Sequence, residues 1–498
     1  MLFNSLDFLV FFPVVTLFYF AWPKKFRYIW LLVSSYYFYM CWNAKYALLL
    51  LLSTAVTYLC GRLLCFFDKC KQPDGKRKKW KKVCVAGSLF VNLSILFFFK
   101  YFNFAFSNLI VIMSRLGIHL QRPIFDVILP VGISFYTFQA LGYTIDVYRG
   151  TLPAEKNFLK YALFVSFFPQ LVAGPIERSR NLLTQIHVPT DFQVENAREG
   201  LLTMAFGLFL KMVMADNIAV IIDPILSDYV NYPGITVAMC IVLFAFQIYC
   251  DFHGYTQIAI GGAEILGFHL QENFSAPYLS GNIKEFWRNW HISLTTWFTD
   301  YLYIPLGGNR KGIYRKYINT MIVFLCSGLW HGASWNFVAW GGLNGLYLVI
   351  YDASKSLRDK ISRQLHIDKA SWGWKIFSRI GTFLLADYAW LYFRAQGLWQ
   401  AIQIQKYIFQ DFYLQYIFTD GFLEMFGGYS KFVVLFLGLL FVFVVDFCQY
   451  KHINWKQGLL QQQIVYRWAA YLTLLFVILV FGMYGVKDAQ TQFIYFQF

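Results

Sequence analysis

The chain has 498 residues, of which 58% are hydrophobic, 21% aromatic and only 14% charged, and its formal net charge is +16. Soluble domains are usually about 45–50% apolar and about 25% charged. This composition excludes a disordered chain, a collagen, a coiled coil and a small disulfide scaffold, and it argues against a soluble enzyme. The sequence therefore predicts a polytopic helical membrane protein.

The N-terminal part contains three predicted membrane spans, and the charges between them indicate their direction. A span needs about 20 apolar residues, and apolar stretches run over 5–22, 28–42 and 46–67. Basic residues follow the first span at 24–27, and eight basic residues against two acidic ones follow the third at 68–82. Short basic loops stay on the cytoplasmic side. We therefore expect the N-terminus outside, and no nucleic-acid partner for the positive charge.

The C-terminal part gives an independent check on this orientation. The basic segment 352–379 is expected in the cytoplasm, and the apolar stretch 377–393 then leads outward. The segment 394–430 is poor in Lys and Arg and is predicted to be an outside loop. Two further spans, 432–450 and 468–485, return inward and lead out again. Both termini are therefore predicted to lie outside the plasma membrane.

The middle of the chain is less regular than either end. Segments 127–175 and 250–300 mix apolar residues with Gly, Pro and polar residues. Non-helical backbone at membrane depth is tolerated only inside the protein or along a water-filled cavity. We therefore expect one all-α domain over 1–498, with about ten or more membrane helices and re-entrant segments around a central cavity.

His331 is the strongest candidate for a catalytic residue. It follows the stretch from Ile318 to Trp330, whose 13 residues make roughly 20 Å of helix against about 30 Å of hydrocarbon. His331 is therefore expected at a turn inside the membrane, where an ionisable residue indicates a functional site. Imidazole can act as a general base near neutrality. The alternative is a buried neutral histidine that bonds a backbone carbonyl.

His291 is a second candidate, in the segment KEFWRNWHISLTTWF. Three tryptophans surround it together with Arg288 and Asn289, and such an aromatic stripe is also typical of packing or of a membrane interface. The chain has no P-loop, no H-E-x-x-H motif and no G-x-S-x-G elbow, and it lacks the H-x4-D motif of glycerolipid acyltransferases. The nine cysteines include no C-x-x-C pair. We expect no metal site.

Five segments together resemble the membrane-bound O-acyltransferase (MBOAT) superfamily, most closely its bacterial cell-envelope branch. That branch includes membrane subunits for O-acetylation of alginate and peptidoglycan and for D-alanylation of teichoic acid. The segments are LPVGISFYTFQALGYTIDVYRG (129–150), FFPQLVAGPIERSR (167–180), IYCDFHGYTQIAIGGAEILGF (248–268), FWRNWHISLTTWFTDYLYIPLGGNR (286–310) and SGLWHGASWNFVAWGGLNG (327–345). The resemblance implies an MBOAT-like helical bundle, an invariant catalytic histidine at His331 and a second conserved polar position at His291.

The resemblance also indicates the residues of the substrate pocket. We expect Asn289, Trp330 and Arg288 to bind substrate, together with Asp251. The family segment that begins at Asp251 more often reads D-F-S-G-Y-S-D, whereas this chain has His253 at its third position. That departure leaves the role of His253 open.

The C-terminus ends in FIYFQF, which matches the F-x-Y-x-x-F acyl-transfer motif of envelope acylation systems. On that resemblance, Phe493, Tyr495 and Phe498 are the motif positions. The charge pattern predicts that the tail 486–498 lies outside the cell. A phenol has an ordinary pKa near 10 and needs a base to become a nucleophile, and His331 is the predicted base. The alternative is an aromatic tail anchored at the membrane interface.

These observations combine into one functional hypothesis, the transfer of an acyl group, chiefly acetyl, across the plasma membrane. The donor is a cytoplasmic thioester, acyl-CoA or a carrier-protein thioester, and the chain holds no cofactor. The acceptor is an extracellular or cell-wall polysaccharide, reached through an acyl-tyrosine and an extracellular or periplasmic esterase-like partner, with membrane lipids around the chain. The alternatives are D-alanyl transfer to teichoic acid, direct acylation of a lipid or protein, and a polysaccharide or lipid transporter. Transporters often show paired halves with matching broken helices, which this sequence lacks.

Overall fold

The fold is all-α, as the sequence predicts. The computed structural model describes residues 1–498 apart from 71–72, 122–128, 173, 485–492 and 494–498. Over the described residues the chain contains helices and turns and no β-strand.

The described chain divides into two compact units. The first unit comprises residues 1–201 and 258–271, and the second comprises residues 202–257 and 272–498. Helices α10 (Val194–Leu208) and α12 (Gly234–Ile265) contain residues of both units. The single domain predicted over 1–498 stays a prediction.

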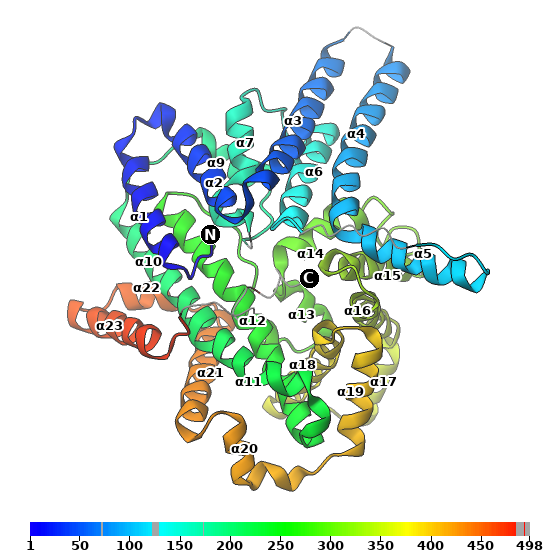
Figure 1. Cartoon of the computed structure of the whole chain (residues 1–498), viewed down its shortest axis with the longest axis vertical. Helices are drawn as coiled ribbons and strands as arrows, with labels where there is room; N and C mark the ends of the chain where they lie inside the picture. The colour runs from blue at the N-terminus through cyan, green and yellow to red at the C-terminus, as the bar shows by residue number, and fades with distance from the viewer. Residues whose placement is uncertain (71–72, 122–128, 173, 485–492, 494–498) are drawn as a thin grey trace. The chain divides into compact units, whose positions relative to one another are not determined.

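The first unit is built mainly from long apolar helices that pack side by side. Its helices before α10 are α1 (Leu6–Ala21), α2 (Arg27–Asn43), α3 (Ala47–Lys69), α4 (Asp74–Leu96), α5 (Phe102–Arg115), α6 (Ile133–Arg149), α7 (Phe158–Ser166), α8 (Phe168–Leu171) and α9 (Ser179–His187). Helices α3 and α4 lie along each other, with α6 against both (Figure 1). The buried Ser53 hydroxyl of α3 donates to Asn92 Oδ1 of α4 at 2.5 Å. Each of these buried polar groups is thereby partnered, as an apolar surrounding requires.

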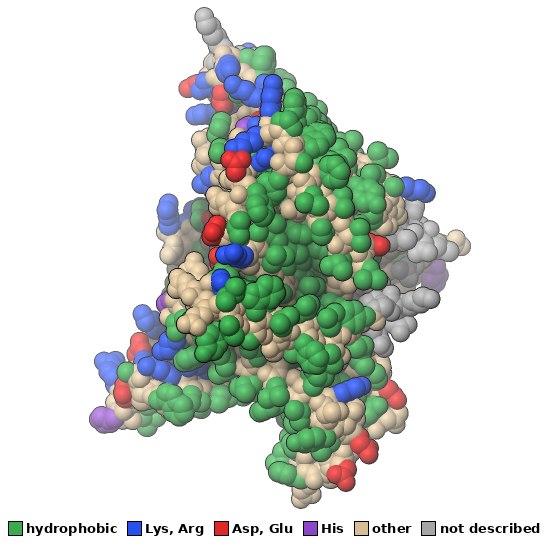
Figure 2. Space-filling model, turned by 90° about the vertical axis from the view of Figure 1, so that its left-hand side faces the viewer, with side chains coloured by type: hydrophobic (Ala, Val, Ile, Leu, Met, Phe, Trp, Pro, Cys, Tyr) green, Lys and Arg blue, Asp and Glu red, His purple; other side chains and the backbone are tan. Residues whose placement is uncertain are grey.

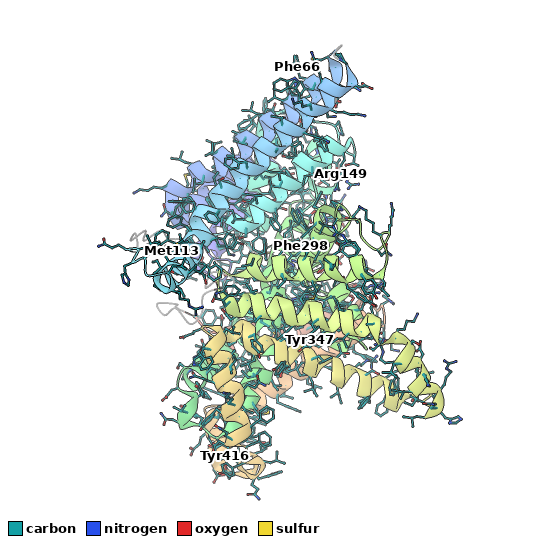
Figure 3. All side chains as sticks on the ribbon, turned by 90° about the vertical axis from the view of Figure 1, so that its right-hand side faces the viewer. Phe66, Met113, Arg149, Phe298, Tyr347 and Tyr416 are labelled. Atoms are coloured by element: carbon teal, nitrogen blue, oxygen red, sulfur yellow. The ribbon has the colours of Figure 1, made fainter. Side chains whose placement is uncertain are left out.

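The second unit contains the remaining helices. They are α11 (Asp216–Ser227), α13 (Ile283–Asn289), α14 (Ile292–Phe298), α15 (Ile313–His331), α16 (Trp335–Ala353), α17 (Lys355–Gln364), α18 (Trp372–Arg394), α19 (Leu398–Gln410), α20 (Asp420–Met425), α21 (Tyr429–Tyr450), α22 (Trp455–Leu460) and α23 (Ile464–Phe481). Helices α15 and α16 form a hairpin and lie side by side in Figure 3, where Tyr347 marks α16. Gly328 and Gly341 face each other across it, and a Cβ on either would collide with a backbone carbonyl of the other helix. Glycine therefore allows the two backbones to approach closely.

Six helical stretches are long and apolar enough to cross a membrane: 24–69, 74–115, 194–227, 234–265, 429–450 and 464–481. Large hydrophobic side chains on them are exposed, among them Phe90, Leu437 and Leu479, and Figure 2 shows hydrophobic side chains over much of the face in view. Large exposed apolar surfaces of this kind are typical of contact with membrane lipid, because their exposure to water is unfavourable. The predicted membrane class is thus confirmed, while the number of membrane helices stays a prediction.

Several segments predicted to be loops are helical instead. The basic run 68–82 enters α4 at Asp74, whose carboxylate pairs with Arg77 one turn later at 2.6 Å. The segment 394–430 contains α19 and α20 rather than an open loop. The hairpin helix α15 begins at Ile313, five residues before the predicted start. Charge patterns report the side of the membrane, not the local backbone conformation, and this explains all three differences.

The middle of the chain is also more helical than predicted. Helix α12 runs unbroken through Gly254, although the sequence around it suggested an interruption. A Cβ at Gly254 would lie 2.8 Å from the carbonyl oxygen of Gly207, so the glycine serves close helix packing. Within the described part of 127–175, α6 is a continuous helix of 17 residues, although its sequence suggested an interruption, and the shorter α7 and α8 follow it.

Candidate active site

His331 is the last residue of α15 and lies at a turn, as predicted. Its depth in the membrane stays a prediction, because α15 has 19 residues rather than the 13 from which that depth was argued. The chain leaves the helix at Gly332, and α16 begins at Trp335. The side-chain amide of Asn336, in the first turn of α16, donates to the carbonyls of Tyr392 at 3.2 Å and Ala395 at 2.9 Å. These bonds hold the start of α16 against the end of α18, and so they position the turn that carries His331.

The surroundings of His331 are aromatic. The side chain is buried, with 4% of its surface exposed. Its ring lies edge-to-face against Trp330, Trp340 and Phe393, with centroids 4.9, 5.0 and 5.4 Å away. Rings at these distances exclude water and fix the orientation of the imidazole. The arrangement suits proton transfer to or from a single bound group.

His291 occupies an unusual backbone conformation directly before α14. Its φ of 44° lies in the left-handed region, which residues other than glycine adopt rarely and often at functional sites. Hydrogen bonds on both sides maintain it: the Trp290 N–H donates to Phe286 at 2.8 Å, and the Ile292 N–H donates to Asn273 at 2.9 Å. The fold therefore holds the His291 side chain in one direction.

The structure brings His291, His331 and Trp330 together. The two imidazole centroids are 6.2 Å apart, and the indole of Trp330 lies against both, 5.9 Å from His291 and 4.9 Å from His331. Phe252 of α12 packs edge-to-face on the other side of His291 at 4.6 Å. The two imidazoles and the indole therefore form one contiguous buried cluster. The roles predicted for these three residues stay predictions.

Asn289 and Arg288 lie beside His291 in the sequence but are placed differently. The Asn289 side-chain amide donates to Ser280 Oγ at 3.2 Å, and the backbone carbonyl of Asn289 accepts from the Ser275 N–H at 3.0 Å. Asn289 therefore supports the segment that carries His291. Arg288 is exposed. Substrate binding by either residue stays a prediction.

Asp251 belongs to a buried group of charges. Lys211 Nζ lies 2.6 Å from Asp251 Oδ1 and 2.8 Å from Asp216 Oδ1, and each of the three side chains is at most 3% exposed. Lys211 lies in the π-helical segment η4 (Phe209–Ala215), which widens the helix locally. A lysine within an apolar span is the sequence signal for this cluster, and the sequence analysis missed it. Both carboxylates contact the lysine, and such a buried ion-paired cluster suits a structural role. Substrate binding by Asp251 stays a prediction.

The C-terminal motif is described at one of its three positions. Phe493 is fully buried. Its ring lies 4.3 Å from Tyr255 and 6.0 Å from Phe252, and Phe252 is the ring that contacts His291. Tyr495 and Phe498 lie outside the described residues, as does the rest of the predicted tail 486–498.

A second group of buried polar side chains in this unit was also not predicted from the sequence. Asp446 of α21 accepts a hydrogen bond from the Tyr249 hydroxyl at 2.8 Å, and that hydroxyl lies 3.1 Å from His253 Nδ1. Tyr249 and His253 are four residues apart, on one face of α12. In the sequence, the four-residue spacing of Tyr249 and His253 and the presence of Asp446 within an apolar span could have indicated this group. His253, the departure from the family pattern, thus belongs to a buried hydrogen-bonded chain.

The described residues contain no group of three or more His, Cys, Asp or Glu side chains placed to hold a metal ion. The prediction that no metal takes part is untested. Fold and site together define a class: a polytopic helical membrane protein with two buried histidines packed among aromatic rings.

Comparison with known proteins identifies the family. The model of the MBOAT, membrane-bound O-acyltransferase family matches residues 152–394. The chain is 37% identical over 401 residues to "Probable alginate O-acetylase AlgI" of Azotobacter vinelandii. The aligned region covers 80% of this chain and 76% of that relative. It is 35% identical over 438 residues to the peptidoglycan O-acetyltransferase of Helicobacter pylori, over 82% of this chain and 79% of the relative. The chain belongs to the membrane-bound O-acyltransferase family and is an O-acetyltransferase of the membrane, as the sequence predicts.

A more distant relative is the teichoic acid D-alanyltransferase of Streptococcus thermophilus. The identity is 30% over 247 residues, which is 45% of this chain and 57% of the relative. The shared part is therefore much shorter than the part shared with the two acetylating relatives.

Proposed function

We propose that the chain transfers an acetyl group from a cytoplasmic thioester to its own Tyr495, for O-acetylation of a polysaccharide outside the cell. The acceptor class is supported by the two relatives, which are named for alginate and for peptidoglycan. The proposal for the chemistry rests on one observation: the first residue of the C-terminal motif is buried next to the ring that contacts His291.

The first step is an ester exchange with His331 as the general base. The imidazole takes the proton of the attacking hydroxyl, the oxygen attacks the thioester carbonyl, and the carbon–sulfur bond breaks. The proton then passes to the departing thiolate, so the products are an acetyl ester and a free thiol. A positioned base of this kind contributes about 10²–10⁴-fold to the rate. The aromatic enclosure of His331 supports this role because it keeps bulk water from competing with the acceptor.

The position of Phe493 bears on the proposed role of Tyr495. Tyr495 follows Phe493 by two residues in the sequence, and two residues of extended chain span at most about 7 Å, so the burial of Phe493 supports the proposal. Removal of the acetyl group regenerates the tyrosine hydroxyl: a sugar hydroxyl attacks the ester and takes the acetyl group. We assign that second step to an extracellular or periplasmic esterase-like partner. The proposal places the donor in the cytoplasm and both chain termini outside.

The test is covalent labelling in purified membranes. Radiolabelled acetyl-CoA is supplied to the wild type, His331→Ala and Tyr495→Phe. Label on the wild-type chain alone supports the relay. Label that persists in Tyr495→Phe moves the covalent site elsewhere and leaves Tyr495 an interfacial anchor. Tyr484→Phe, another tyrosine near the C-terminus, is the matched control and should keep the label.

The same preparation decides between donors. If acetyl-CoA labels nothing, a D-alanyl carrier-protein thioester is offered next, since the shorter match to a D-alanyltransferase makes that donor the main alternative. Label from the D-alanyl donor alone would replace the acetyl assignment. Transfer to a lipid or protein without any label on the chain would replace the relay by direct acylation.

A further inference from the structure

A cavity in the first unit is lined by an unusual set of cations. It has a volume of about 160 Å³ and lies where α1 ends and α2 begins, beside α7 and α9. Four permanent cations line it, together with a histidine: Lys24, Lys25, Arg27, Lys160 and His187. Among the described residues that line it there is no Asp or Glu. Such a lining favours an anion.

Arg27 makes the cavity a built site rather than a group of loose surface lysines. Its guanidinium is buried, with 6% of the residue exposed. Its nitrogens donate to the backbone carbonyls of Trp22 at 3.0 Å, Thr190 at 2.7 Å and Phe20 at 3.2 Å. These acceptors carry no formal charge, so no hydrogen bond joins Arg27 to a carboxylate.

Lys160 is held in place on the opposite wall. Its ammonium lies 3.0 Å from His187 Nδ1 and 5.4 Å from the centre of the Tyr28 ring. His187 Nε2 in turn lies 2.7 Å from Glu155 Oε2. Burial raises the pKa of Glu155, but hydrogen bonds from the Asn157 N–H and from His187 outweigh it and lower the pKa overall. The carboxylate thus stays ionised and orients the imidazole toward Lys160.

Two carboxylates near the cavity leave part of its charge uncompensated. Asp191 pairs with Lys24 at 2.6 Å, outside the lining, and Glu155 interacts with His187. Lys25, Arg27 and Lys160 remain as cations without an ion pair to a carboxylate among the described residues. Four cations against these two carboxylates leave the surroundings of the cavity positive by about two charges at neutral pH.

The rest of the lining is apolar, which narrows the class of ligand. The apolar and aromatic residues are Tyr19, Tyr28, Leu31, Leu163, Ile186, Pro189 and Phe268. A free phosphate ion would leave this wall without a partner, whereas a phosphate attached to acyl chains would use it. The cations also lie at the ends of apolar helices, where membrane headgroups are found.

We infer that this cavity binds the phosphate group of an anionic membrane phospholipid, with the start of an acyl chain against the apolar wall. The inference concerns the first unit alone and does not depend on the acyl-transfer chemistry. The other source of a phosphate on the same face of the membrane is the thioester donor, and the experiment separates the two.

The test is native mass spectrometry of the purified full chain with phosphatidylglycerol or phosphatidylcholine added. The wild type should retain phosphatidylglycerol in preference to phosphatidylcholine. The double variant Lys25→Gln/Lys160→Gln should bind phosphatidylglycerol at least about tenfold less tightly, because each lysine near an anionic headgroup contributes about fivefold. Lys160→Arg keeps the charge and should retain most of the binding.

The matched control is Lys355→Gln/Lys360→Gln, which removes two exposed charges from α17 and should retain the lipid like the wild type. Equal retention of both lipids by the wild type would overturn the inference, as would wild-type retention by the double variant. Displacement of the lipid by acetyl-CoA, with a raised KM for acetyl-CoA in the double variant, would assign the cavity to the donor. Displacement by inorganic phosphate at equal concentration would assign it to a free anion.

Discussion

Two groups of buried ionisable side chains in the second unit differ in what surrounds them. Lys211 lies within 2.8 Å of two carboxylates, so opposite charges partner one another. His331 and His291 are instead enclosed by aromatic rings and lie near each other. A buried ion-paired charge maintains a fold, whereas an imidazole among rings is suited to proton transfer. Burial of an ionisable side chain within a membrane protein is therefore not enough to indicate a catalytic residue. The side chains that surround it distinguish a structural role from a catalytic one.

Replacement of His331 should distinguish the histidine pair from the Lys211 cluster most clearly, through its effect on activity. We expect His331→Ala to lower acetyl transfer by about 10²–10⁴-fold, because the base for the attacking hydroxyl is lost. The amount of folded protein in the membrane should not change. His119→Ala, at an exposed histidine, is the control. Acetyl transfer at the wild-type rate in His331→Ala would remove the basis for a catalytic histidine site.

Replacement of Lys211 should have the opposite signature. Lys211→Met leaves two buried carboxylates without their cation, and loss of one partner of a buried ion pair lowers the free energy of unfolding by about 3–5 kcal/mol. Thermal unfolding in detergent measures the loss. A triple variant that also carries Asp216→Asn and Asp251→Asn should recover part of the stability. Normal stability with lost activity in Lys211→Met would move this cluster into the reaction.

His291 should show a smaller effect on activity than His331. We expect His291→Ala to lower acetyl transfer by about 10²-fold, as misplacement of a reacting group does. His291→Asn, which tolerates the left-handed backbone, should be as stable as the wild type and still be impaired. Full activity of the asparagine variant would mean that residue 291 contributes its backbone conformation rather than its imidazole.

The anchor at Phe493 gives a weaker and more local effect. Burial of a phenylalanine side chain contributes about 1.5–3 kcal/mol, so Phe493→Ala should reduce docking of the tail, and with it chain labelling, by about tenfold or more. Phe493→Leu should keep most of the label. The unfolding temperature should change little because the segment is terminal. Unchanged labelling in Phe493→Ala would contradict the proposed relay.

The smallest effect is expected at Arg288. Its side chain is exposed, and surface substitutions usually change stability by less than about 0.5 kcal/mol. Arg288→Gln should therefore leave the free energy of unfolding within about 0.5 kcal/mol of the wild type. A marked rise in the KM for the thioester donor would support the predicted role of Arg288 in substrate binding, and an unchanged KM would contradict it.

Patterns along the chain predict a large share of the fold and a smaller share of the site. Apolar runs located α2, α3 and α21 within a few residues, because a span must match the thickness of the hydrocarbon. Apolar runs did not locate α19 and α20, because the segment 394–430 was interpreted only from its low content of Lys and Arg. Glycines were read as interruptions in α12, although Gly254 is where helix packing requires a missing side chain.

The membrane class and the family were readable in the sequence, because composition, span length and motif order are properties of the chain itself. The sequence also selected His291 and His331 as candidates for one site, but it could not give the distances between residues of different helices. Helix packing brings His291 and His331 within 6.2 Å, joins Asp251 to Lys211 and places Phe493 against Phe252. Only the tertiary structure decided these pairs, because the distance between residues of different helices depends on packing and not on their separation along the chain.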